Sequence, residues 1–229
     1  MGIDLVEIRE RTREYFDAVG LRYFELFQDE LTQKPYDRKL LKRFAGLVGR
    51  GGTVCDAGCG PCGHVTRFLA DQGLDLIGVD LAVRCIDLAR AAQPALTFRV
   101  MDMMRMDFET GSLEGLVAYY SILYTPKVHL PMLFQEFHRV LKPGGKVLVV
   151  VKEGEGEGWI DDPMGSGVRT FFASFKATEL KTILEASGFR CLFSGLREPY
   201  AFEFPVKRIA MIAEKAAAQD SMPPWTPVR

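Results

Sequence analysis

The chain of 229 residues contains 48% hydrophobic, 26% charged and 11% aromatic residues, fractions that exclude a disordered, collagenous or coiled-coil chain. Its 29 basic and 30 acidic residues leave a net charge of −1, without the basic excess that favours a nucleic-acid or anionic-membrane partner. No apolar run has the length of a membrane span, and the charged start lacks the apolar core of a signal sequence. We therefore expect a cytoplasmic globular protein with no membrane or nucleic-acid partner, whose five cysteines are reduced.

The first fifty residues have helical patterning with one internal glycine break. We predict helices over residues 3–19 and 21–31, separated at Gly20, and a third over residues 36–48. In the third helix, apolar residues recur at the spacing of one helix face. The glycine-rich segment 49–52 ends this helical region.

From residue 53 onward, short apolar runs alternate with helical patterns. The predicted strands are 53–55, 74–79, 96–100, 116–119 and 147–151, and the predicted helices between them are 63–72, 83–92 and 130–141. This alternation indicates a parallel sheet with helices on both faces. After a flexible Glu/Gly stretch at 153–158, we predict a helix at 177–187, two successive strands at 190–196 and 207–214, and a loose tail at 216–229. Successive strands with a short connection are expected to be antiparallel.

A glycine-rich segment, VCDAGCGPCGH at residues 54–64, joins the first predicted strand to its helix. Ligands of open α/β sheets bind at the carboxyl ends of the strands, and glycines let the backbone approach them. The run GCGPCG fits the G-x-G-x-x-G pattern of a dinucleotide site, with Asp80 about 20 residues further on. Cys59 and Cys62 fit a thioredoxin-like redox motif, whereas Asp56 together with Asp80 fits an S-adenosylmethionine (SAM) site. A tight turn with buried cysteines would explain the segment without any ligand.

The chain resembles class I SAM-dependent methyltransferases, in particular the small-molecule group with the pattern D-x-G-C-G-P at this turn. A further hallmark is the segment EFHRVLKPGG at residues 136–145, which neither a dinucleotide dehydrogenase nor a thioredoxin predicts. The match covers about residues 15–214. The resemblance implies an α/β, Rossmann-like three-layer sandwich: a seven-stranded, mostly parallel sheet with an antiparallel last strand and an N-terminal helical lid.

The same resemblance implies one methyltransferase domain over residues 1–215. Residues 1–50 form its lid, residues 53–215 form the SAM-binding core, and residues 216–229 are a flexible tail. The lid is expected to cover the active site, and Phe16 and Tyr23 match positions that are aromatic in relatives.

The resemblance also implies the contacts to the cofactor, SAM, which leaves as S-adenosylhomocysteine. The glycine-rich turn lies beside the methionine part, and Asp80 accepts hydrogen bonds from the ribose hydroxyls. Asp102 lies beside the adenine, although Asp107 is close enough in sequence to be the binding acid instead. Cys62 stands where many relatives have a glycine, which leaves the contact of Gly63 open. The expected cofactor-binding residues are Asp56, Gly58, Cys59, Gly60, Asp80, Leu81, Asp102, Met103, Tyr119 and Tyr23, and no metal is expected.

The loop at residues 119–124, after the fourth predicted strand, resembles the family segment that bridges SAM and the acceptor. It lacks the Asn/Asp-Pro-Pro-Tyr pattern of nucleic-acid and protein amide methyltransferases. Methyl transfer from an activated sulfonium is an in-line displacement that needs a general base only if the acceptor must lose its proton early. The candidates for that base are His129, which could equally cap a helix, Tyr120 and Tyr124. The expected acceptor-binding residues are Tyr120, Ser121, Tyr124, Trp159, Phe171 and Tyr200, although core packing explains the aromatic ones equally well.

We therefore expect a SAM-dependent methyltransferase that methylates an oxygen or nitrogen of a small organic molecule. Two alternatives stay open. The literal G-x-G-x-x-G pattern allows an NAD-binding oxidoreductase, and Cys59 and Cys62 allow a non-catalytic SAM-binding or thiol-redox protein.

Overall fold

A seven-stranded sheet forms the centre of the computed structural model, which describes residues 4–216. Its strand order is β3-β2-β1-β4-β5-β9-β8. The strands β1 to β5 are parallel, whereas β9 is antiparallel to both of its neighbours. The bounds are β1 (Thr53–Ala57), β2 (Asp75–Asp80), β3 (Thr97–Val100), β4 (Leu113–Tyr119), β5 (Leu141–Lys152), β8 (Phe189–Arg197) and β9 (Arg208–Lys215). The predicted fold class, including the antiparallel last strand, is therefore confirmed.

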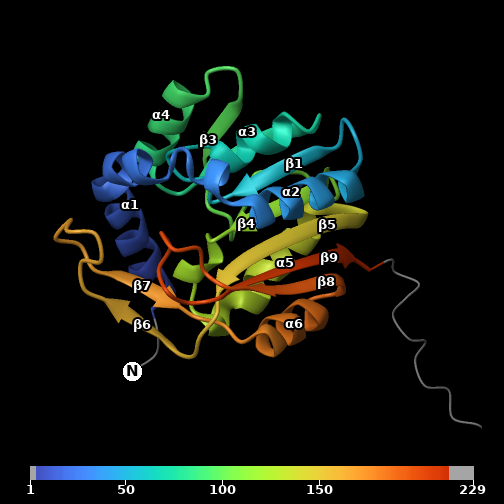
Figure 1. Cartoon of the computed structure of the whole chain (residues 1–229). Coiled ribbons are helices and arrows are strands. Elements are labelled where there is room, and N and C mark those ends of the chain that lie inside the picture. The colour runs from blue at the N-terminus through green and yellow to red at the C-terminus, as the bar shows by residue number, and fades with distance from the viewer. Residues whose placement is uncertain (1–3, 217–229) are drawn as a thin grey trace, which may run out of the picture.

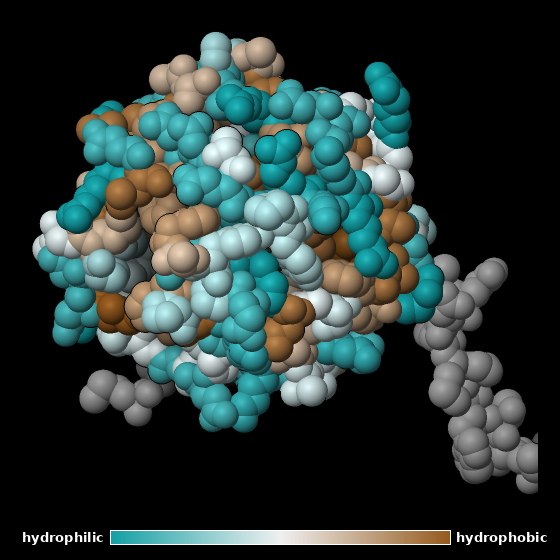
Figure 2. All heavy atoms as spheres, in the orientation of Figure 1, coloured by the Kyte–Doolittle hydropathy of each residue, from teal (hydrophilic) through white to brown (hydrophobic). Residues whose placement is uncertain are grey.

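Helices cover both faces of this sheet (Figure 1). One face packs against α2 (Pro35–Val48), α3 (His64–Ala70) and α4 (Val83–Ala92), and the other against α5 (Leu130–Val140) and α6 (Ala177–Ala186). None of the helices within residues 4–216 has the length and apolar character that crossing a membrane requires. On the face drawn in Figure 2, hydrophilic and hydrophobic residues are interspersed.

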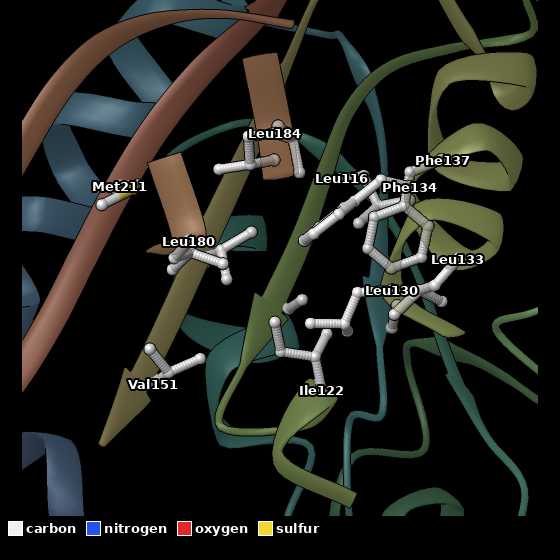
Figure 3. Packing of buried hydrophobic residues seen from close by; sticks show 14 of the residues in the cluster. Leu116, Ile122, Leu130, Leu133, Phe134, Phe137, Val151, Leu180, Leu184 and Met211 are labelled. Atoms are coloured by element: carbon white, nitrogen blue, oxygen red, sulfur yellow. The ribbon is translucent and has the colours of Figure 1, made fainter. Parts of the chain in front are cut away.

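The helix α5 shows how the sequence pattern builds the core. Its apolar residues recur at helical spacing, so Leu130, Leu133, Phe134 and Phe137 all point to one side and are fully buried. Figure 3 shows these side chains together with Leu116 of β4. Burying each of them contributes about 1.5–3 kcal/mol, which fixes α5 against the strands that lead to the site.

The first helix differs from the prediction, because α1 (Leu5–Phe27) runs through Gly20 without a break. Gly20 lies where α1 packs on α4, and a Cβ added there would be 3.2 Å from Cγ of Arg84 and 3.4 Å from Leu88. The glycine therefore serves the close approach of two helices and does not end the helix. The predicted second helix is wrong beyond Phe27, where a short 3-10 helix follows at Glu30–Gln33.

The predicted flexible stretch after β5 is also partly wrong. It contains the start of β6 (Glu157–Ile160), which pairs antiparallel with β7 (Thr170–Ala173). This hairpin lies beside α1 (Figure 1), where Arg169 forms an ion pair of 2.9 Å with Glu7. The helix α1 lines the large cavity at the carboxyl ends of the parallel strands, and the hairpin packs against this helix. The tail prediction concerns residues that, from 217 onward, lie outside the described chain.

Candidate cofactor and acceptor site

Two adjoining cavities lie where the parallel strands end. The large cavity, about 780 Å³, and the small cavity, about 340 Å³, share Tyr23, Gly58, Gly60 and Tyr119 in their walls. The rest of the large cavity is lined by Arg9, Thr12, Phe16, Asp80, Leu81, Met101, Asp102, Met103, Met104, Tyr120, Ser121, Tyr124 and Thr125. The rest of the small cavity is lined by Glu30, Asp56, Cys59, Pro61, Cys62, His64 and Val65. Every residue predicted to bind the cofactor therefore lies on one of the two cavities.

The glycine-rich turn is held tightly against the loop after β4. Gly58 has a φ of +78°, which a residue with a side chain rarely adopts. A Cβ at Gly58 would also lie only 2.3 Å from Cβ of Ser121. Gly63 plays a different part, because a Cβ there would lie 2.6 Å from the ring of Phe98. Gly63 thus permits close packing between α3 and β3, and it lines neither cavity.

Asp80, the last residue of β2, presents its carboxylate to the large cavity. The amide of Gly60 donates to Oδ2 and the amide of Ala82 donates to Oδ1, each at 3.0 Å. Burial raises the pKa of Asp80 to about 6, because the charged form loses hydration. Within the described chain no cationic side chain forms an ion pair with Asp80. Its remaining lone pairs can accept hydrogen bonds from a ligand.

Asp56 is 1% exposed at the end of β1 and faces the small cavity. The hydroxyl of Thr66, on α3, donates a hydrogen bond of 2.7 Å to Oδ2. Burial raises the pKa of Asp56 to about 6. The hydrogen bond ties the glycine-rich turn to the helix that follows it.

Asp102 supplies the second carboxylate of the large cavity. Its Oδ1 accepts from the amide of Met104 at 2.9 Å, and its Oδ2 accepts from Arg9 of α1. The alternative acid Asp107 is exposed and lines neither cavity. Of these two acids, only Asp102 lines the large cavity. The contact of Arg9 was missed, since nothing in the local sequence pairs the first helix with the loop after β3.

Titratable side chains line the small cavity, among them Glu30, Asp56 and His64, and of these three Glu30 is the one that no local sequence pattern indicates. Glu30 lies 2.9 Å from Nε2 of His64 and also pairs with the buried ammonium of Lys34. Burial opposes ionisation of Glu30, but hydrogen bonds and charge from His64 and Lys34 lower its pKa below the usual value. The second ring nitrogen of His64, Nδ1, is buried without a hydrogen-bond partner in the described chain. Opposite charges thus lie beside the glycine-rich turn.

A buried ion network continues from Lys34 toward the far end of the sheet. Lys34 lies 3.0 Å from Glu203, which pairs with Arg197 at 2.6 Å. Arg197 lies 2.9 Å from Asp37, and Asp37 accepts a hydrogen bond of 2.7 Å from the hydroxyl of Tyr119. Burial alone would raise the pKa of Glu203, but the hydrogen bonds from Arg197, Tyr200 and Lys34 lower it to about 2. The network fixes the wall that both cavities share.

The loop after β4 turns sharply into the large cavity. Tyr120 has a φ of +58°, an uncommon conformation for a residue with a side chain, and its amide donates to Val150 O at 2.9 Å. Tyr124 belongs to a 3-10 helix at Ile122–Tyr124 and makes an edge contact with Phe16, with ring centroids 4.9 Å apart. The buried Ser121 Oγ has no hydrogen-bond partner among residues 4–216. The predicted acceptor residues of this loop therefore line the cavity together.

The candidates for a general base are less well placed. Burial raises the pKa of Tyr120 and Tyr124 above the usual range, so both hydroxyls stay protonated at neutral pH and can act as hydrogen-bond donors. His129 is the residue that precedes α5, at the end of the 3-10 helix Lys127–His129. It lines neither cavity, and although it occupies the N-cap position of α5, its side chain makes no capping hydrogen bond.

The other three predicted acceptor residues lie away from the cavities. Phe171 is 2% exposed and belongs to the core, with the ring of Trp159 at 5.9 Å in an edge contact. Tyr200 stacks on Phe202, with ring centroids 5.6 Å apart, and its hydroxyl accepts from the amide of Tyr36. None of these three rings therefore lines either cavity.

Neither cysteine of the glycine-rich turn has the character of a redox thiol. Cys59 and Cys62 are free and buried. Burial raises the pKa of Cys62 to about 12 and that of Cys59 well above its ordinary value, whereas a thioredoxin-like motif depends on a lowered thiol pKa. Among residues 4–216, no three His, Cys, Asp or Glu side chains are gathered to hold a metal ion.

Comparisons with known proteins agree with this geometry. A family model described as a methyltransferase domain matches residues 54–145. The demethylmenaquinone methyltransferase of Lactococcus lactis is 29% identical over 152 residues, which cover 62% of this chain and 58% of that protein. The magnesium-protoporphyrin O-methyltransferase of Rhodobacter capsulatus is 32% identical over 142 residues, which cover 54% of this chain and 61% of that protein. The chain therefore spans less than two thirds of the length of these curated relatives.

A solved structure extends the comparison to nearly the whole chain. The 1,6-didemethyltoxoflavin-N1-methyltransferase of Burkholderia thailandensis, with bound 1,6-didemethyltoxoflavin and S-adenosylhomocysteine, aligns with a TM-score of 0.72 and 20% identity. The alignment covers 95% of this chain and 92% of that one. At this identity the likeness shows the fold. Together with the family model, it confirms the predicted resemblance to class I SAM-dependent methyltransferases and SAM as the cofactor of this type of domain.

Proposed function

We propose that this chain, which carries a class I SAM-dependent methyltransferase domain, transfers a methyl group to an oxygen or nitrogen of a small organic acceptor by in-line displacement. The observation that carries the proposal is the place of Asp80: a partly buried carboxylate, held by the amides of Gly60 and Ala82 and without an ion-pair partner among residues 4–216, which faces the large cavity. The cavity is lined by aromatic and apolar side chains together with a few polar groups, as small-molecule sites are. We treat residues 1–50 as the lid of this domain and infer a cytoplasmic location from its five free cysteines.

The large cavity has the chemistry that a nucleoside requires. Asp80 would accept hydrogen bonds from the two ribose hydroxyls, because one carboxylate offers enough lone pairs for both. Asp102 would accept from the adenine amino group, with Met103 beside the ring. Met101 and Met104 add polarizable side chains to the same wall, which suit a flat aromatic base.

The small cavity has the charges that an amino acid requires. Glu30 would accept a hydrogen bond from the α-ammonium of the methionine part, and the unpartnered nitrogen of His64 would face the same end. Gly58 and Gly60 let the backbone come close, because neither carries a Cβ. These groups support a zwitterionic ligand end at the turn.

The wall formed by the loop after β4 would receive the acceptor. When bound, SAM supplies a methyl carbon already activated by its sulfonium. The protein then has to hold the acceptor in line, which lowers barriers by about 7–11 kcal/mol in well-oriented cases. The hydroxyls of Tyr120, Ser121 and Tyr124 would orient the acceptor by hydrogen bonds. Tyr120 and Tyr124 would act as donors, because burial keeps both protonated.

Isothermal titration with S-adenosylhomocysteine and with NAD tests the proposal. We expect binding of S-adenosylhomocysteine and none of NAD, and at least about a tenfold loss of affinity in Asp80→Ala, the scale of one charge-assisted hydrogen bond. Asp107→Ala is the matched control, because that carboxylate is exposed and outside both cavities. Tight binding of NAD without a response to S-adenosylhomocysteine would instead support an oxidoreductase.

A further inference from the structure

Lys152 stands at the carboxyl end of β5, next to the acceptor wall but outside the cavities. The strand β5 pairs with β4, whose loop carries Tyr120 and Tyr124 into the large cavity. Lys152 Nζ lies 5.1 Å from the ring centroid of Phe172, and Phe172 makes an edge contact with Tyr124. One aromatic ring therefore separates the ammonium from the ring that lines the cavity.

The cations around Lys152 have partners of their own. Lys34 pairs with Glu30 and Glu203, and Arg197 pairs with Asp37 and Glu203. Arg208, the register partner of Lys152 on β9, lies 3.6 Å from Glu203. These partners are all buried or nearly so.

No carboxylate within residues 4–216 forms an ion pair with Lys152. The three neighbouring cations and Lys152 together face three carboxylates, so Lys152 is the cation left without a counter-ion. Burial, followed by the charges of Arg208 and Lys34, lowers the pKa of Lys152. A partly desolvated cation next to other cations is unfavourable by itself. An anion placed beside the ammonium would relieve this cost and gain a charge-assisted hydrogen bond.

The surroundings of Lys152 also indicate what kind of anion fits. Lys152 Nζ lies 5.7 Å from the ring centroid of Phe204, and Phe204 is 67% exposed. Phe172 and Phe204 thus flank the ammonium with two aromatic surfaces, of which one is open to solvent. An aromatic ring of a ligand can stack or make edge contacts with such surfaces, while its negative group faces the ammonium.

We propose that Lys152, flanked by Phe172 and Phe204, binds the negatively charged end of the methyl acceptor, which is therefore an aromatic compound that carries a carboxylate. This inference rests on the proposed function only in assigning the ligand to the methyl-transfer site. The binding of an aromatic anion by Lys152 stands on the geometry of these three residues. The carboxylate would be bound at the end of β5 while the rest of the acceptor reaches Tyr124.

Nuclear magnetic resonance titration with benzoate and with its neutral counterpart benzamide tests the proposal, in the presence and in the absence of S-adenosylhomocysteine. We expect the wild-type protein to bind benzoate about tenfold more tightly than benzamide, the scale of one charge-assisted hydrogen bond. Lys152→Met should abolish this preference and Lys152→Arg should keep it. Lys181→Met, which removes an exposed lysine of α6, should leave it unchanged.

A second variant separates the aromatic contribution from the charge. Phe204→Leu should weaken benzoate and benzamide alike, because it removes a stacking surface and keeps the cation. Equal affinity for the two probes in the wild type, or a benzoate preference that survives in Lys152→Met, would overturn the proposal. Titration of each variant with S-adenosylhomocysteine tests the proposed function independently of Lys152. If S-adenosylhomocysteine did not bind, the proposed function would be contradicted. The comparison of benzoate with benzamide would still decide the role of Lys152.

Discussion

The amide of Gly60 donates a hydrogen bond of 3.0 Å to Asp80 Oδ2, which joins the glycine-rich turn after β1 to the end of β2. The two strands are neighbours in the parallel sheet, so their carboxyl ends must meet at one edge. The hydrogen bond orients the carboxylate, and the amide of Ala82 holds its other oxygen. The carboxylate that we propose binds the cofactor is thus oriented by two backbone amides.

The first prediction concerns the pH dependence of cofactor binding. Burial raises the pKa of Asp80 to about 6 in the free protein, and only the ionised carboxylate accepts from both ribose hydroxyls. The affinity for S-adenosylhomocysteine should therefore be full above this pKa and fall as the pH decreases through it. Calorimetric titrations between pH about 5 and about 8 measure this dependence.

Asp80→Asn provides the control for this prediction, because its amide does not titrate. The variant should bind more weakly at neutral pH and lose most of the pH dependence, with any remainder coming from Asp56, whose pKa is also about 6. A wild-type affinity that stays constant from pH about 5 to about 8 would contradict the assignment of the ribose contact to Asp80.

The second prediction concerns the buried hydrogen bond between Thr66 and Asp56. Thr66→Val keeps the shape of the side chain but removes the donor, which should lower the free energy of unfolding by about 1–3 kcal/mol at neutral pH. The pKa of Asp56 is already raised by burial, so the unpaired carboxyl should be protonated and better tolerated in acid. The difference from the wild type should therefore grow as the pH rises through about 6.

Urea denaturation at pH about 5 and about 8 tests this difference. The matched control is Thr178→Val, at an exposed position near the start of α6, which should change stability by no more than about 0.5 kcal/mol. If both variants had the same stability at both pH values, the hydrogen bond would contribute nothing.

The sequence was informative where the structure depends on local pattern. The alternation of strands and helices predicted the parallel order, and the bounds of α4 agree with the predicted helix at 83–92. The glycine-rich turn and Asp80 could be placed because strand ends meet at one edge of such a sheet. In contrast, Arg9 of α1 and Glu30 of the 3-10 helix that follows it reach the cavities through tertiary packing, which no local pattern encodes.

The hairpin of β6 and β7 shows a second limit of the sequence. Its first strand, Glu157–Ile160, has only four residues and begins within the Glu/Gly stretch, so its pairing with β7 reveals it and the local pattern does not. Trp159 and Phe171 were assigned to the acceptor by residue type, yet they pack on each other. Aromatic residues of a core and of a ligand site look alike in a single sequence.

The third prediction concerns Gly20, which the sequence suggested as a helix break. Gly20→Val should destabilise the protein by about 1–3 kcal/mol, because the added side chain must displace Arg84 and Leu88 of α4. Gly46→Ala in α2 is the contrasting case: nothing lies within 4 Å of its added Cβ, so better helix propensity should stabilise the protein by about 0.5–1 kcal/mol. Chemical denaturation measures both. A Gly20→Val protein as stable as the wild type would contradict the packing role of the glycine.

The last prediction concerns the thiols of the glycine-rich turn. Burial raises the pKa of Cys59 and Cys62, and the reactive form of a cysteine is the thiolate. Both should therefore react slowly with a disulfide reagent in the native protein, whereas the partly exposed Cys191 should react first. Cys191→Ala should remove this fast phase, and the double variant Cys59→Ala/Cys62→Ala should keep it.

The affinity of that double variant then separates a packing role from a chemical one. We expect S-adenosylhomocysteine to bind within about threefold of the wild-type affinity, since each change removes one small apolar group and keeps Gly58, Gly60 and the backbone of the turn. Fast reaction of Cys59 or Cys62 in the native protein, with loss of thiol oxidation in the double variant, would support the redox alternative. Slow reaction with retained cofactor affinity leaves these two cysteines as packing residues of the turn.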